Sequence, residues 1–581
     1  MKSTRSTALR LLRLLALAWA LCMVQALRAQ SPVIAPSAVD ENLRQQQRER
    51  LLREQQERTP DVHLKAGEPA APLALPAREA PCVQVHRLQL KGDAAEQFQW
   101  ALSAADRLPA GGLDRATPRC LGSGGMNIVM RRIQDAIAAS GYPAARVLAG
   151  VDALAEPGTL RLTLWPGRIG KIRFAPGTSA RARAGNALAM HEGDVLYLPD
   201  LEQSLENFQR VPTVQAGIDL LPAEAPGAPG RSDLLIHWQQ ARLLRGMLGL
   251  DDSGTRATGK YLGSATLSCD HCLQLNDLFY LSGTRALGGG DEGERGTHST
   301  VAHYSLPFGY WQLAGTVSQS RFWQSVAGLN GPIEYSGETG QGELRLGRLL
   351  HRGRLGKTSL ALRIWARSAR NFIEDTEVQA QRSRMAGWGA TLLHRQFIAA
   401  ATLDLGLDYR RGTGAVHAID PPEAARGEGT ARMQILSADA QLALPFKLGS
   451  QALRYAATLR AQFNGTPLVP LDRFAIGSRY TVRGFDGEQQ LVAERGFFLR
   501  NDLALALGST AQELYLGLDV SAVGGPSSDL LLGKHLAGAV LGWRAQAAGV
   551  NLDWFCGAPI SRPHGFGQDG PVFGFNLNWV F

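Results

Sequence analysis

The amino-acid sequence predicts a transmembrane antiparallel β-barrel that follows a lone polar helix and two small α/β domains. Three observations predict it: a start typical of exported proteins, a helix-and-strand pattern that occurs twice before residue 240, and a period-two alternation of apolar and polar residues from residue 241 to the end. The 65 glycines, about 11% of the chain against a usual share of about 7%, also indicate many turns between strands.

Residues 1–29 have the pattern of a secretory signal peptide. Basic residues precede the apolar run Leu14–Val24, and alanines follow it in "QALRAQ". We expect cleavage after Ala29 or Ala26. A membrane anchor is the alternative, but the apolar run is short and no stop-transfer pattern follows it. No later stretch has the roughly 18 uninterrupted apolar residues of a membrane-spanning helix, so we expect the mature chain to enter a membrane only through strands.

Residues 30–58 contain a candidate helix that is polar on every side. The stretch "VDENLRQQQRERLLREQQER" has helix-favouring residues throughout and only three leucines. Such a helix cannot pack into an ordinary core, so it is disordered, bridges solvent or lies in a water-filled channel. Residues 59–80, with four prolines among alanines, are predicted to form an extended linker.

Two compact α/β domains are predicted at residues 81–166 and 167–240. In the first, "NIVMRRIQDAIAASGYP" places apolar residues on one helical face and ends at Gly141, and the alternating strand "GTLRLTLWPG" follows. In the second, "LPDLEQSLENFQRVP" begins with a first-turn proline and spaces Leu201, Leu205 and Phe208 as a helix requires. The strands "VQAGIDLL" and "SDLLIHWQ" come after it.

Residues 241–581 alternate as β-strands do. "TLDLGLDYR" sends leucines and a tyrosine to one side and polar residues to the other, and "LRYAATLRAQF" does the same. A soluble sandwich also alternates. A membrane barrel is favoured by strands of about 9 to 11 residues, by aromatic residues near strand ends, and by long Gly-rich connections that alternate with short ones. The terminal stretch "VFGFNLNWVF" alternates too and ends on Phe581.

Signatures of enzyme sites fail on inspection. "GKTS" at Gly356–Ser359 is similar to part of a phosphate-binding loop, but His351 stands where that motif needs glycine, and the context is a strand. No G-x-S-x-G elbow is present. We therefore predict no enzyme activity, no catalytic residue, no metal site and no cofactor.

The cysteines are interpreted for an oxidising compartment, where disulfides persist. Cys82 and Cys120 bracket the front of the first α/β domain, and a disulfide between them would stabilise it by roughly 4 kcal/mol in the chain-entropy model. Cys269 and Cys272 in "CDHC" form a local disulfide, which we favour, or part of a metal site that would need further ligands, or they are free thiols or paired elsewhere. Cys556, in a late strand, is interpreted as a small apolar residue.

Three segments resemble one known family, in that family's order. "CLGSGGMNIVMRRIQDAIAASGYPAARV" and "LPDLEQSLENFQRVPTVQAGIDLLP" resemble the first and second POTRA domains of the TpsB transporters of two-partner secretion, ShlB/FhaC/HecB-like proteins of the Omp85 superfamily. "FAIGSRYTVRGFDGEQQLVAERGFFLRNDL" resembles the family's sixth extracellular loop with its V-R-G-[FY] motif, except that Ser478 stands where a second glycine is usual. The resemblance covers essentially the whole mature chain. It implies about 16 barrel strands in the outer membrane of a Gram-negative cell, with both POTRA domains in the periplasm.

The resemblance also implies roles for particular residues, which are named at the end of this paragraph. The polar helix would be a plug in the barrel lumen, and the motif would lie at the tip of a loop folded into the lumen. The loop arginine needs an anionic partner, and "YLGLDVSA" offers an inward-facing aspartate on the strand that meets the loop in the family. The pair either pins the loop for stability or also sets the conducting state, and the terminal aromatic resembles the assembly signal of outer-membrane barrels. The loop motif is Val482, Arg483, Gly484 and Phe485, the anchoring partner is Asp519, and the assembly signal is Phe581.

The function expected from this resemblance is secretion. The POTRA domains would recognise an unfolded TpsA-type exoprotein, a haemolysin, haemagglutinin or adhesin, and the barrel would pass it to the cell surface without nucleotide hydrolysis. Other expected contacts are outer-membrane lipid and, during biogenesis, the barrel assembly machinery. Five of the positive charges behind the net charge of +9 lie in the signal, so no nucleic-acid partner is expected. The alternative is a barrel-assembly factor of the same superfamily. A diffusion porin would have no use for two α/β domains, and no spacing suggests a hydrolase.

Overall fold

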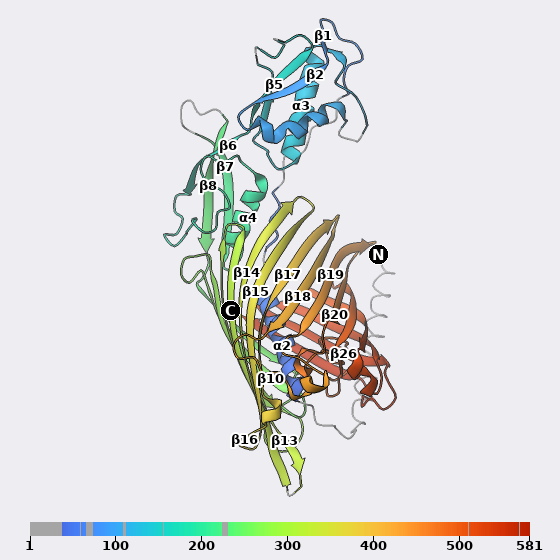
Figure 1. Cartoon of the computed structure of the whole chain (residues 1–581). Helices are drawn as coiled ribbons and strands as arrows, with labels where there is room; N and C mark the ends of the chain where they lie inside the picture. The colour runs from blue at the N-terminus through green and yellow to red at the C-terminus, as the bar shows by residue number, and fades with distance from the viewer. Residues whose placement is uncertain are drawn as a thin grey trace, which may run out of the picture.

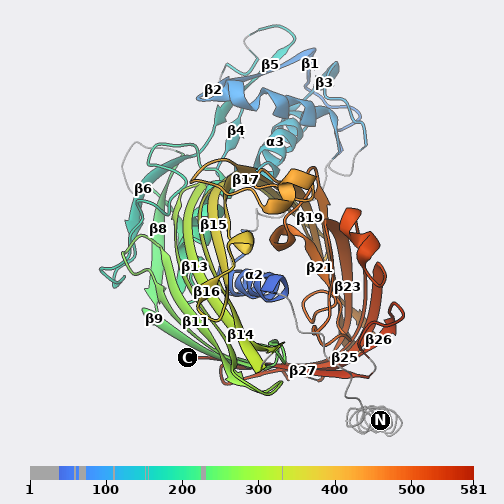
Figure 2. The same cartoon turned by 60° about the horizontal axis from the view of Figure 1, so that its bottom comes forward.

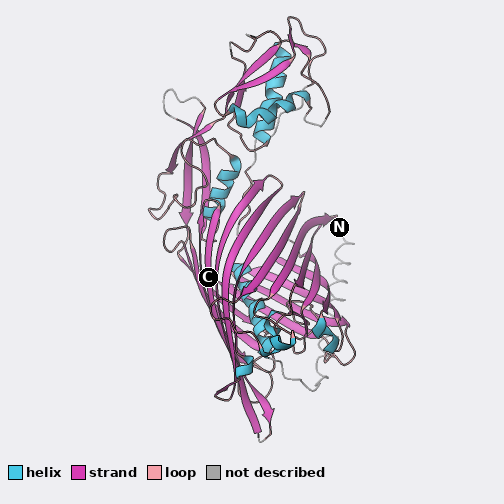
Figure 3. Cartoon of the chain, viewed as in Figure 1, coloured by secondary structure: helices cyan, strands magenta, loops and turns pink. Residues whose placement is uncertain are grey.

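The computed structural model describes residues 38–581 apart from residues 58–59, 65–73, 109–111, 151, 155, 224–229, 330, 509 and 569 (Figure 1). The expected signal peptide, residues 1–29, lies outside the described residues. Helix α2 (Ala38–Gln56) comes first, and two α/β domains and a closed barrel follow. Figure 3 shows that the barrel wall consists of strands, while the longer helices lie in the α/β domains and inside the barrel. No helix in the described part of the chain has the length and apolar content needed to cross a bilayer.

The first α/β domain has a three-stranded sheet in the order β2-β5-β4, with β2 parallel and β4 antiparallel to β5. Helix α3 buries Val129, Ile133 and Ile137 completely against this sheet, as the helical spacing in the sequence predicts. The Sγ atoms of Cys82 and Cys120 form a disulfide beside the β1–β3 pair. The elements are β1 Val83–Val85, β2 Arg87–Gly92, η1 Ala95–Asp106, β3 Arg119–Leu121, α3 Ser123–Ala139, β4 Arg146–Leu148 and β5 Thr159–Trp165.

The second α/β domain repeats this topology. Its sheet has the order β6-β8-β7, again with the first strand parallel and the second antiparallel to the central one. Helix α4 buries Leu201, Leu205 and Phe208, the residues that the helical spacing selected. The elements are β6 Arg168–Phe174, α4 Leu198–Gln209, β7 Val214–Pro222 and β8 Arg231–Gln240.

The second α/β domain docks on the turns at one end of the barrel, which we call the near end. Asn207 on α4 donates to the carbonyl of Gly309 at 2.8 Å, and Asn186 donates to the carbonyl of Pro307 at 3.0 Å. Arg210 donates to the carbonyl of Ser305 at 2.9 Å. These contacts fix the α/β domain against the rim, and the opposite end of the barrel is the far end.

The barrel is a closed antiparallel sheet of 16 strands, with the short β16 added beside β15. Strand β27 closes the sheet on β9 through the pairs from Asn576↔Asp251 to Val580↔Met247. A closed sheet leaves no unpaired edge, which is what a sheet needs in order to cross hydrocarbon. The strands are β9 Leu244–Asp251, β10 Tyr261–Asp270, β11 Leu278–Gly288, β12 Arg295–Phe308, β13 Trp311–Gly328, β14 Gly331–Gly353, β15 Gly356–Ile373, β16 Thr376–Glu377, β17 Ser383–Ile398, β18 Ala401–Thr413, β19 Gln434–Leu448, β20 Gln451–Asn464, β23 Arg495–Ala506, β24 Gln512–Gly524, β25 His535–Ala547, β26 Val550–Ser561 and β27 Val572–Val580.

The expected strand length of 9 to 11 residues is wrong for much of the barrel. Strand β9 has 8 residues, β13 and β15 have 18, and β14 has 23. The β13–β14 hairpin extends past its neighbours at the far end (Figures 1 and 3). Bilayer thickness sets only the minimum length of a strand. Strands β13, β14 and β15 remain paired with one another beyond that length.

The two faces of the barrel wall differ as the alternation predicts. In β24, Leu516, Leu518 and Val520 are 53%, 52% and 44% exposed on the outer surface, while Asp519 is 1% exposed on the inner one. Leucines exposed in this way over many strands form a surface suited to lipid. Figure 2 shows α2 inside the barrel, surrounded by the wall.

The "CDHC" stretch lies at the near end of β10. Cys269 and Cys272 are bonded to each other. The ring nitrogens of His271 contact the carbonyl of Arg181 and the backbone N–H of Asn276, both at 2.9 Å. Among the described residues, no group of three histidine, cysteine, aspartate or glutamate side chains is placed to hold a metal ion. Cys556 lies buried in β26.

Both described parts of the expected linker, residues 59–80, are docked. Leu75 is buried against the first α/β domain, where its N–H donates to Asp114 at 2.8 Å. Glu79 accepts from the N–H groups of Gly122 and Gly125. Residues 60–64 lie at the near end of the barrel.

Candidate functional site

The connection between β20 and β23, residues 465–494, folds back into the barrel. It contains the 3-10 turn η4 (Pro470–Asp472) and the paired strands β21 (Phe474–Ile476) and β22 (Leu491–Ala493). An apolar cluster joins it to the wall, and within that cluster Phe485 meets Phe566 edge to face with ring centres 5.6 Å apart. Val482 and Phe485 are 0% and 1% exposed. The loop therefore has a small core of its own, which fixes its position.

Arg483 at the tip of this loop is bound to Asp519 on β24. Its Nε donates to Oδ2 at 2.8 Å and its Nη2 to Oδ1 at 2.7 Å, a two-pronged contact typical of strong arginine–carboxylate pairs. The backbone N–H of Arg483 also donates to Oδ2 of Asp519, at 2.9 Å. Both side chains are buried, so the pair is well shielded from water.

A second carboxylate shares the arginine. Nη2 of Arg483 lies 2.6 Å from Oδ1 of Asp502 on β23, and Asp502 also pairs with Arg544 on β25 at 2.9 Å. The Arg544 guanidinium lies over the ring of Tyr515, 3.8 Å from its centre. The loop tip is thus one member of a charge network that extends over three neighbouring strands. Removing one charge from such a buried network leaves the others uncompensated.

Glycines in the wall make room for the loop tip. A Cβ on Gly538 of β25 would lie 1.9 Å from the carbonyl oxygen of Arg483, and a Cβ on Gly557 of β26 would lie 2.8 Å from the backbone nitrogen of Gly484. Gly484 itself has φ of 104° and a Cβ there would lie 2.5 Å from the carbonyl oxygen of Ala558. Only glycine fits this close approach of two backbones. We call Gly538 and Gly557 the glycine floor of the loop.

Helix α2 touches the same loop. Nη2 of Arg44 donates to the carbonyl of Gly487 at 2.5 Å, and the hydroxyl of Ser478 lies 3.4 Å from Oε1 of Gln47. The helix and the loop therefore share the lumen and restrain each other.

Polar contacts join α2 to the barrel wall. Arg50 pairs with Asp439 on β19 at 3.1 Å, and Arg53 pairs with Glu343 on β14 at 3.0 Å. Ser318 on β13 donates to Glu49 at 3.1 Å. A helix without an apolar face is suited to this polar lumen, as the sequence predicts.

These contacts all involve side chains of α2. They are side-chain ion pairs and hydrogen bonds, each of which contributes a net stabilisation of roughly 0.5 to 3 kcal/mol, whereas the wall is held by its own continuous backbone ladder. None of the strand pairs of the barrel includes a residue of α2.

The site residues predicted from the sequence do not form one site but lie in several parts of the structure. The loop motif and Asp519 lie together in the lumen, while Phe581 lies at the near end of the seam, where its N–H and carbonyl both bond to Gly246. The two disulfides lie in the first α/β domain and in the near-end turn after β10. The sequence reasoning missed Asp502, although the alternation in "FFLRNDLALAL" was a signal that could have found it. It also missed the glycine floor, because two glycines on separate strands carry no local signal.

Comparisons with known proteins agree with this architecture. The model of the family described as haemolysin secretion/activation protein ShlB/FhaC/HecB matches residues 230–545, and the POTRA domain model matches residues 168–222. The outer membrane transporter CdiB-2 of Burkholderia pseudomallei strain 1026b is 33% identical over 578 residues, which cover 96% of this chain and 97% of that protein. The hemolysin transporter protein ShlB of Serratia marcescens is 25% identical over 458 residues, which cover 78% of this chain and 78% of that protein. The solved structure of CdiB from Acinetobacter baumannii aligns with a TM-score of 0.82 at 27% identity, over 95% of this chain and all of that one.

Proposed function

Because this chain belongs to the ShlB/FhaC/HecB family of two-partner secretion transporters, we propose that it passes one unfolded exoprotein of the TpsA type from the periplasm to the cell surface. The barrel spans the outer membrane, and the POTRA domains lie in the periplasm. The near end of the barrel is therefore the periplasmic end. The observation that carries the proposal is the polar helix α2, which contacts of its side chains hold in the lumen.

Helix α2 acts in this proposal as a plug that leaves before the exoprotein enters. The wall residues that it covers, such as Glu343 and Asp439, are polar, and they would be exposed to water and to the passing chain once the plug has left. A polar lumen suits an unfolded chain, whose backbone must keep hydrogen-bond partners along the whole path.

The POTRA domains are the proposed recognition surface. Strand β7 lies at an edge of the second POTRA sheet, and Leu220 and Leu221 on it are 43% and 41% exposed. An extended exoprotein segment can add to such an edge through backbone hydrogen bonds, with nearby apolar side chains as contacts.

The loop tip is the proposed control point of the pore. Asp519 and Asp502 hold Arg483, and the glycine floor seats the backbone of the tip. In this proposal the anchored loop sets the conducting state of the barrel, beyond any contribution to stability.

We further propose that transport needs no nucleotide and that the protein is not an enzyme. The "GKTS" stretch lies at the start of β15, a barrel strand, rather than in the strand-to-helix turn that binds phosphate. The driving force is then expected to be folding of the exoprotein outside the cell.

Deleting the gene in its own host tests the proposed function. We expect one large protein to disappear from the cell surface and medium, by quantitative mass spectrometry, and to return with the wild-type gene. The abundance of other outer-membrane barrels should not change. A general loss of barrels from the outer membrane would contradict secretion and favour the barrel-assembly alternative.

A further inference from the structure

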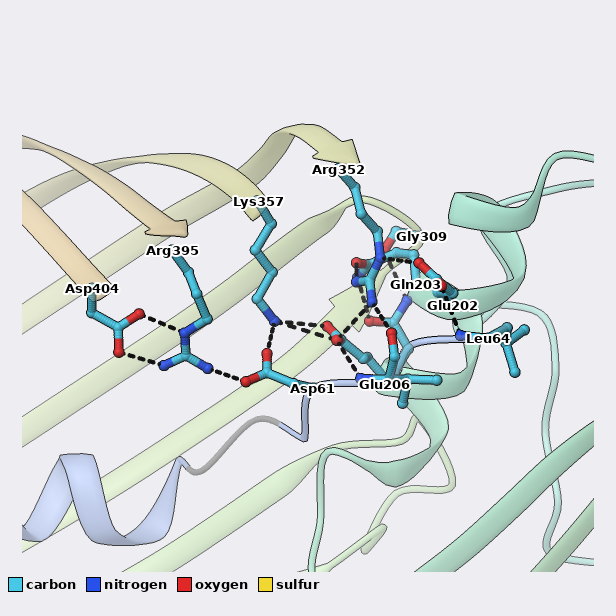
Figure 4. A network of polar contacts seen from close by, with 12 residues as sticks. Asp61, Leu64, Glu202, Gln203, Glu206, Gly309, Arg352, Lys357, Arg395 and Asp404 are labelled. Atoms are coloured by element: carbon cyan, nitrogen blue, oxygen red, sulfur yellow. Dashed lines mark hydrogen bonds and ion pairs between the residues drawn. The ribbon is translucent and has the colours of Figure 1, made fainter. Parts of the chain in front are cut away.

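The segment that follows the plug is bound in an extended form between the second POTRA domain and the periplasmic rim of the barrel (Figure 4). The backbone N–H groups of Val62 and Leu64 donate to Glu206 and Glu202 of α4, at 3.1 and 2.8 Å. Arg352 at the end of β14 donates to the carbonyl of Val62 at 2.7 Å. Such contacts, at the N–H and carbonyl of Val62 and at the N–H of Leu64, can hold an extended chain whatever its side chains.

One side chain of the segment is recognised by charge. Asp61 pairs with Lys357 on β15 at 2.6 Å and with Arg395 on β17. Burial opposes ionisation of Asp61, but hydrogen bonds and charge from Lys357 and Arg395 outweigh burial and lower its pKa below the usual range. The carboxylate is therefore ionised at periplasmic pH. His63 makes an edge-to-face contact with Phe397.

The groups that hold the segment also hold one another. Arg352 pairs with Glu202 at 3.0 Å and with Glu206 at 2.9 Å, and all three side chains are buried. Lys357 reaches Glu206 at 3.3 Å, and Arg395 binds Asp404 on β18 through two nitrogens. These partners keep the charged groups in place without the segment. We call this set of residues, Glu202, Glu206, Arg352, Lys357 and Arg395, the rim seat.

We propose that the rim seat is a peptide-binding site for the exoprotein, which residues 60–64 fill while the pore is plugged. The occupant that displaces them is an extended chain with one acidic side chain, because the seat binds backbone groups through α4 and Arg352 and one carboxylate through Lys357 and Arg395. This inference rests on the proposed secretion function. It adds where on the periplasmic face the exoprotein first competes with the plug.

Displacement at the rim seat would act directly on the plug. Helix α2 ends at Gln56, and Asp61 is five residues later, so the chain between them spans at most about 17 Å. While Asp61 is bound, the plug cannot move far toward the periplasm. An exoprotein segment in the seat would free this tether at the moment when cargo is at the pore entrance.

Peptide binding to the purified full-length barrel in planar bilayers tests the inference. The probes are the chain's own peptide TPDVHLK, a second acidic peptide APDVSLA that keeps the aspartate but lacks the histidine and the lysine, and the APNVSLA version without the charge. We expect either acidic peptide, added on the periplasmic side, to increase the frequency of open events, and APNVSLA to be at least tenfold weaker. A variant that lacks residues 38–64 should bind fluorescent APDVSLA more tightly than the whole chain does, because its seat is empty.

Matched variants assign the binding to the rim seat. In the variant lacking residues 38–64, Lys357→Ala with Arg395→Ala should weaken APDVSLA binding at least tenfold. Arg348→Ala, which removes an exposed cation that lies over Trp311, should leave binding unchanged. Binding of TPDVHLK alone, or of none of the peptides, would overturn the inference. Secretion measured in the host is a separate readout. If deleting the gene abolishes secretion of one protein but the peptides do not bind, the rim seat alone is rejected. If deleting the gene leaves secretion unchanged, the proposed function is rejected.

Discussion

The carboxylate of Asp519 binds both the backbone N–H and the guanidinium of Arg483. Oδ2 of Asp519 accepts from both the backbone N–H and Nε of Arg483, at 2.9 and 2.8 Å, while Oδ1 accepts from Nη2 at 2.7 Å. A single carboxylate thus fixes the position of the loop tip and the direction of its side chain. This makes Asp519 more than a counter-ion, and the two residues are not equivalent in their effect on the loop.

We predict that Arg483→Ala and Asp519→Ala both reduce export of the exoprotein at least tenfold while the barrel still assembles. Removing one partner of a buried pair costs about 3 to 5 kcal/mol, but no rung of the strand ladder depends on the pair. Export per heat-modifiable barrel in the outer membrane is the measurement. Arg370→Ala is the control, since Arg370 pairs with Glu338 outside the charge network of the loop. Near-normal export by both variants would contradict a role of the loop motif in export.

The charge swap Arg483→Asp with Asp519→Arg should not restore export. An aspartate at 483 would face Asp502, which lies 2.6 Å from the native guanidinium, and an arginine at 519 could not accept the backbone N–H of residue 483. Recovery of export in the swap, measured at matched barrel levels, would show that the pair acts as a simple tether.

Substituting the glycine floor should reproduce the loop phenotype without any change of charge. A methyl group at Gly538 would meet the carbonyl oxygen of Arg483 at 1.9 Å, so Gly538→Ala must displace the loop tip. Gly283→Ala in β11 is the matched control, because nothing lies within 4 Å of a Cβ there. We expect Gly538→Ala to alter channel recordings and to lower export, with Gly283→Ala like wild type. Equal export by the two variants would mean that the glycine floor is not needed for export.

Deleting residues 38–57 should increase single-channel conductance in planar bilayers, because the plug obstructs ions and contributes no strand pairing. The double variant Arg50→Ala with Arg53→Ala, which removes the ion pairs to Asp439 and Glu343, should raise the frequency of open events. Glu54→Ala should not, since among the described residues Glu54 forms its ion pair with Arg50 of the same helix. Unchanged conductance after deletion would contradict the assignment of α2 as the plug.

Removing Phe581 should lower the amount of assembled barrel more than it alters the pore. Its backbone makes the last two hydrogen bonds of the β27–β9 seam, with Gly246, and its ring is 48% exposed on the outer surface. Phe446→Ala is the control, an outward aromatic on β19 near the same rim with 38% exposure. Quantitative blotting of outer-membrane fractions gives the readout. Normal levels of the truncated protein would require another role for the last strand.

The disulfide Cys82–Cys120 should stabilise the first POTRA domain by roughly 4 kcal/mol in the chain-entropy model, since it closes a loop with a sequence separation of 38. Cys82→Ser with Cys120→Ser should therefore speed hydrogen exchange across α3 and β5. The comparison is Cys269→Ser with Cys272→Ser, which removes a disulfide that closes a sequence separation of only 3. If exchange in α3 and β5 matched the wild type, the disulfide would be of little consequence to the domain.

The sequence predicted those features that are carried by local periodicity. Alternation identified the barrel wall and the inward position of Asp519, and helical spacing identified Leu201, Leu205 and Phe208 as buried. The number of strands and the roles of the loop and of α2 came from the family resemblance. Long strands such as β14 were missed because pairing can continue beyond the bilayer.

The rest of the site depends on residues far apart in the chain. Gly538 lies against the backbone of Arg483, and Asp61 lies beside Lys357 at the start of β15 and Arg395 near the end of β17. No window of sequence contains such a pair, so a single sequence gives no period or spacing from which to infer it. Three-dimensional coordinates were needed for the glycine floor and for the rim seat.

The exoprotein is proposed to pass through the lumen that α2 occupies, and crosslinking tests this path most directly. Ser318 and Val317 are neighbours on β13: Ser318 faces the plug and bonds to Glu49, while Val317 is 65% exposed on the lipid side. With a photo-crosslinking residue at each position and an exoprotein stalled by a folded domain, we predict crosslinks to the exoprotein from position 318 and none from position 317. Crosslinks from 317 alone, or from neither position while export continues, would contradict passage through the lumen.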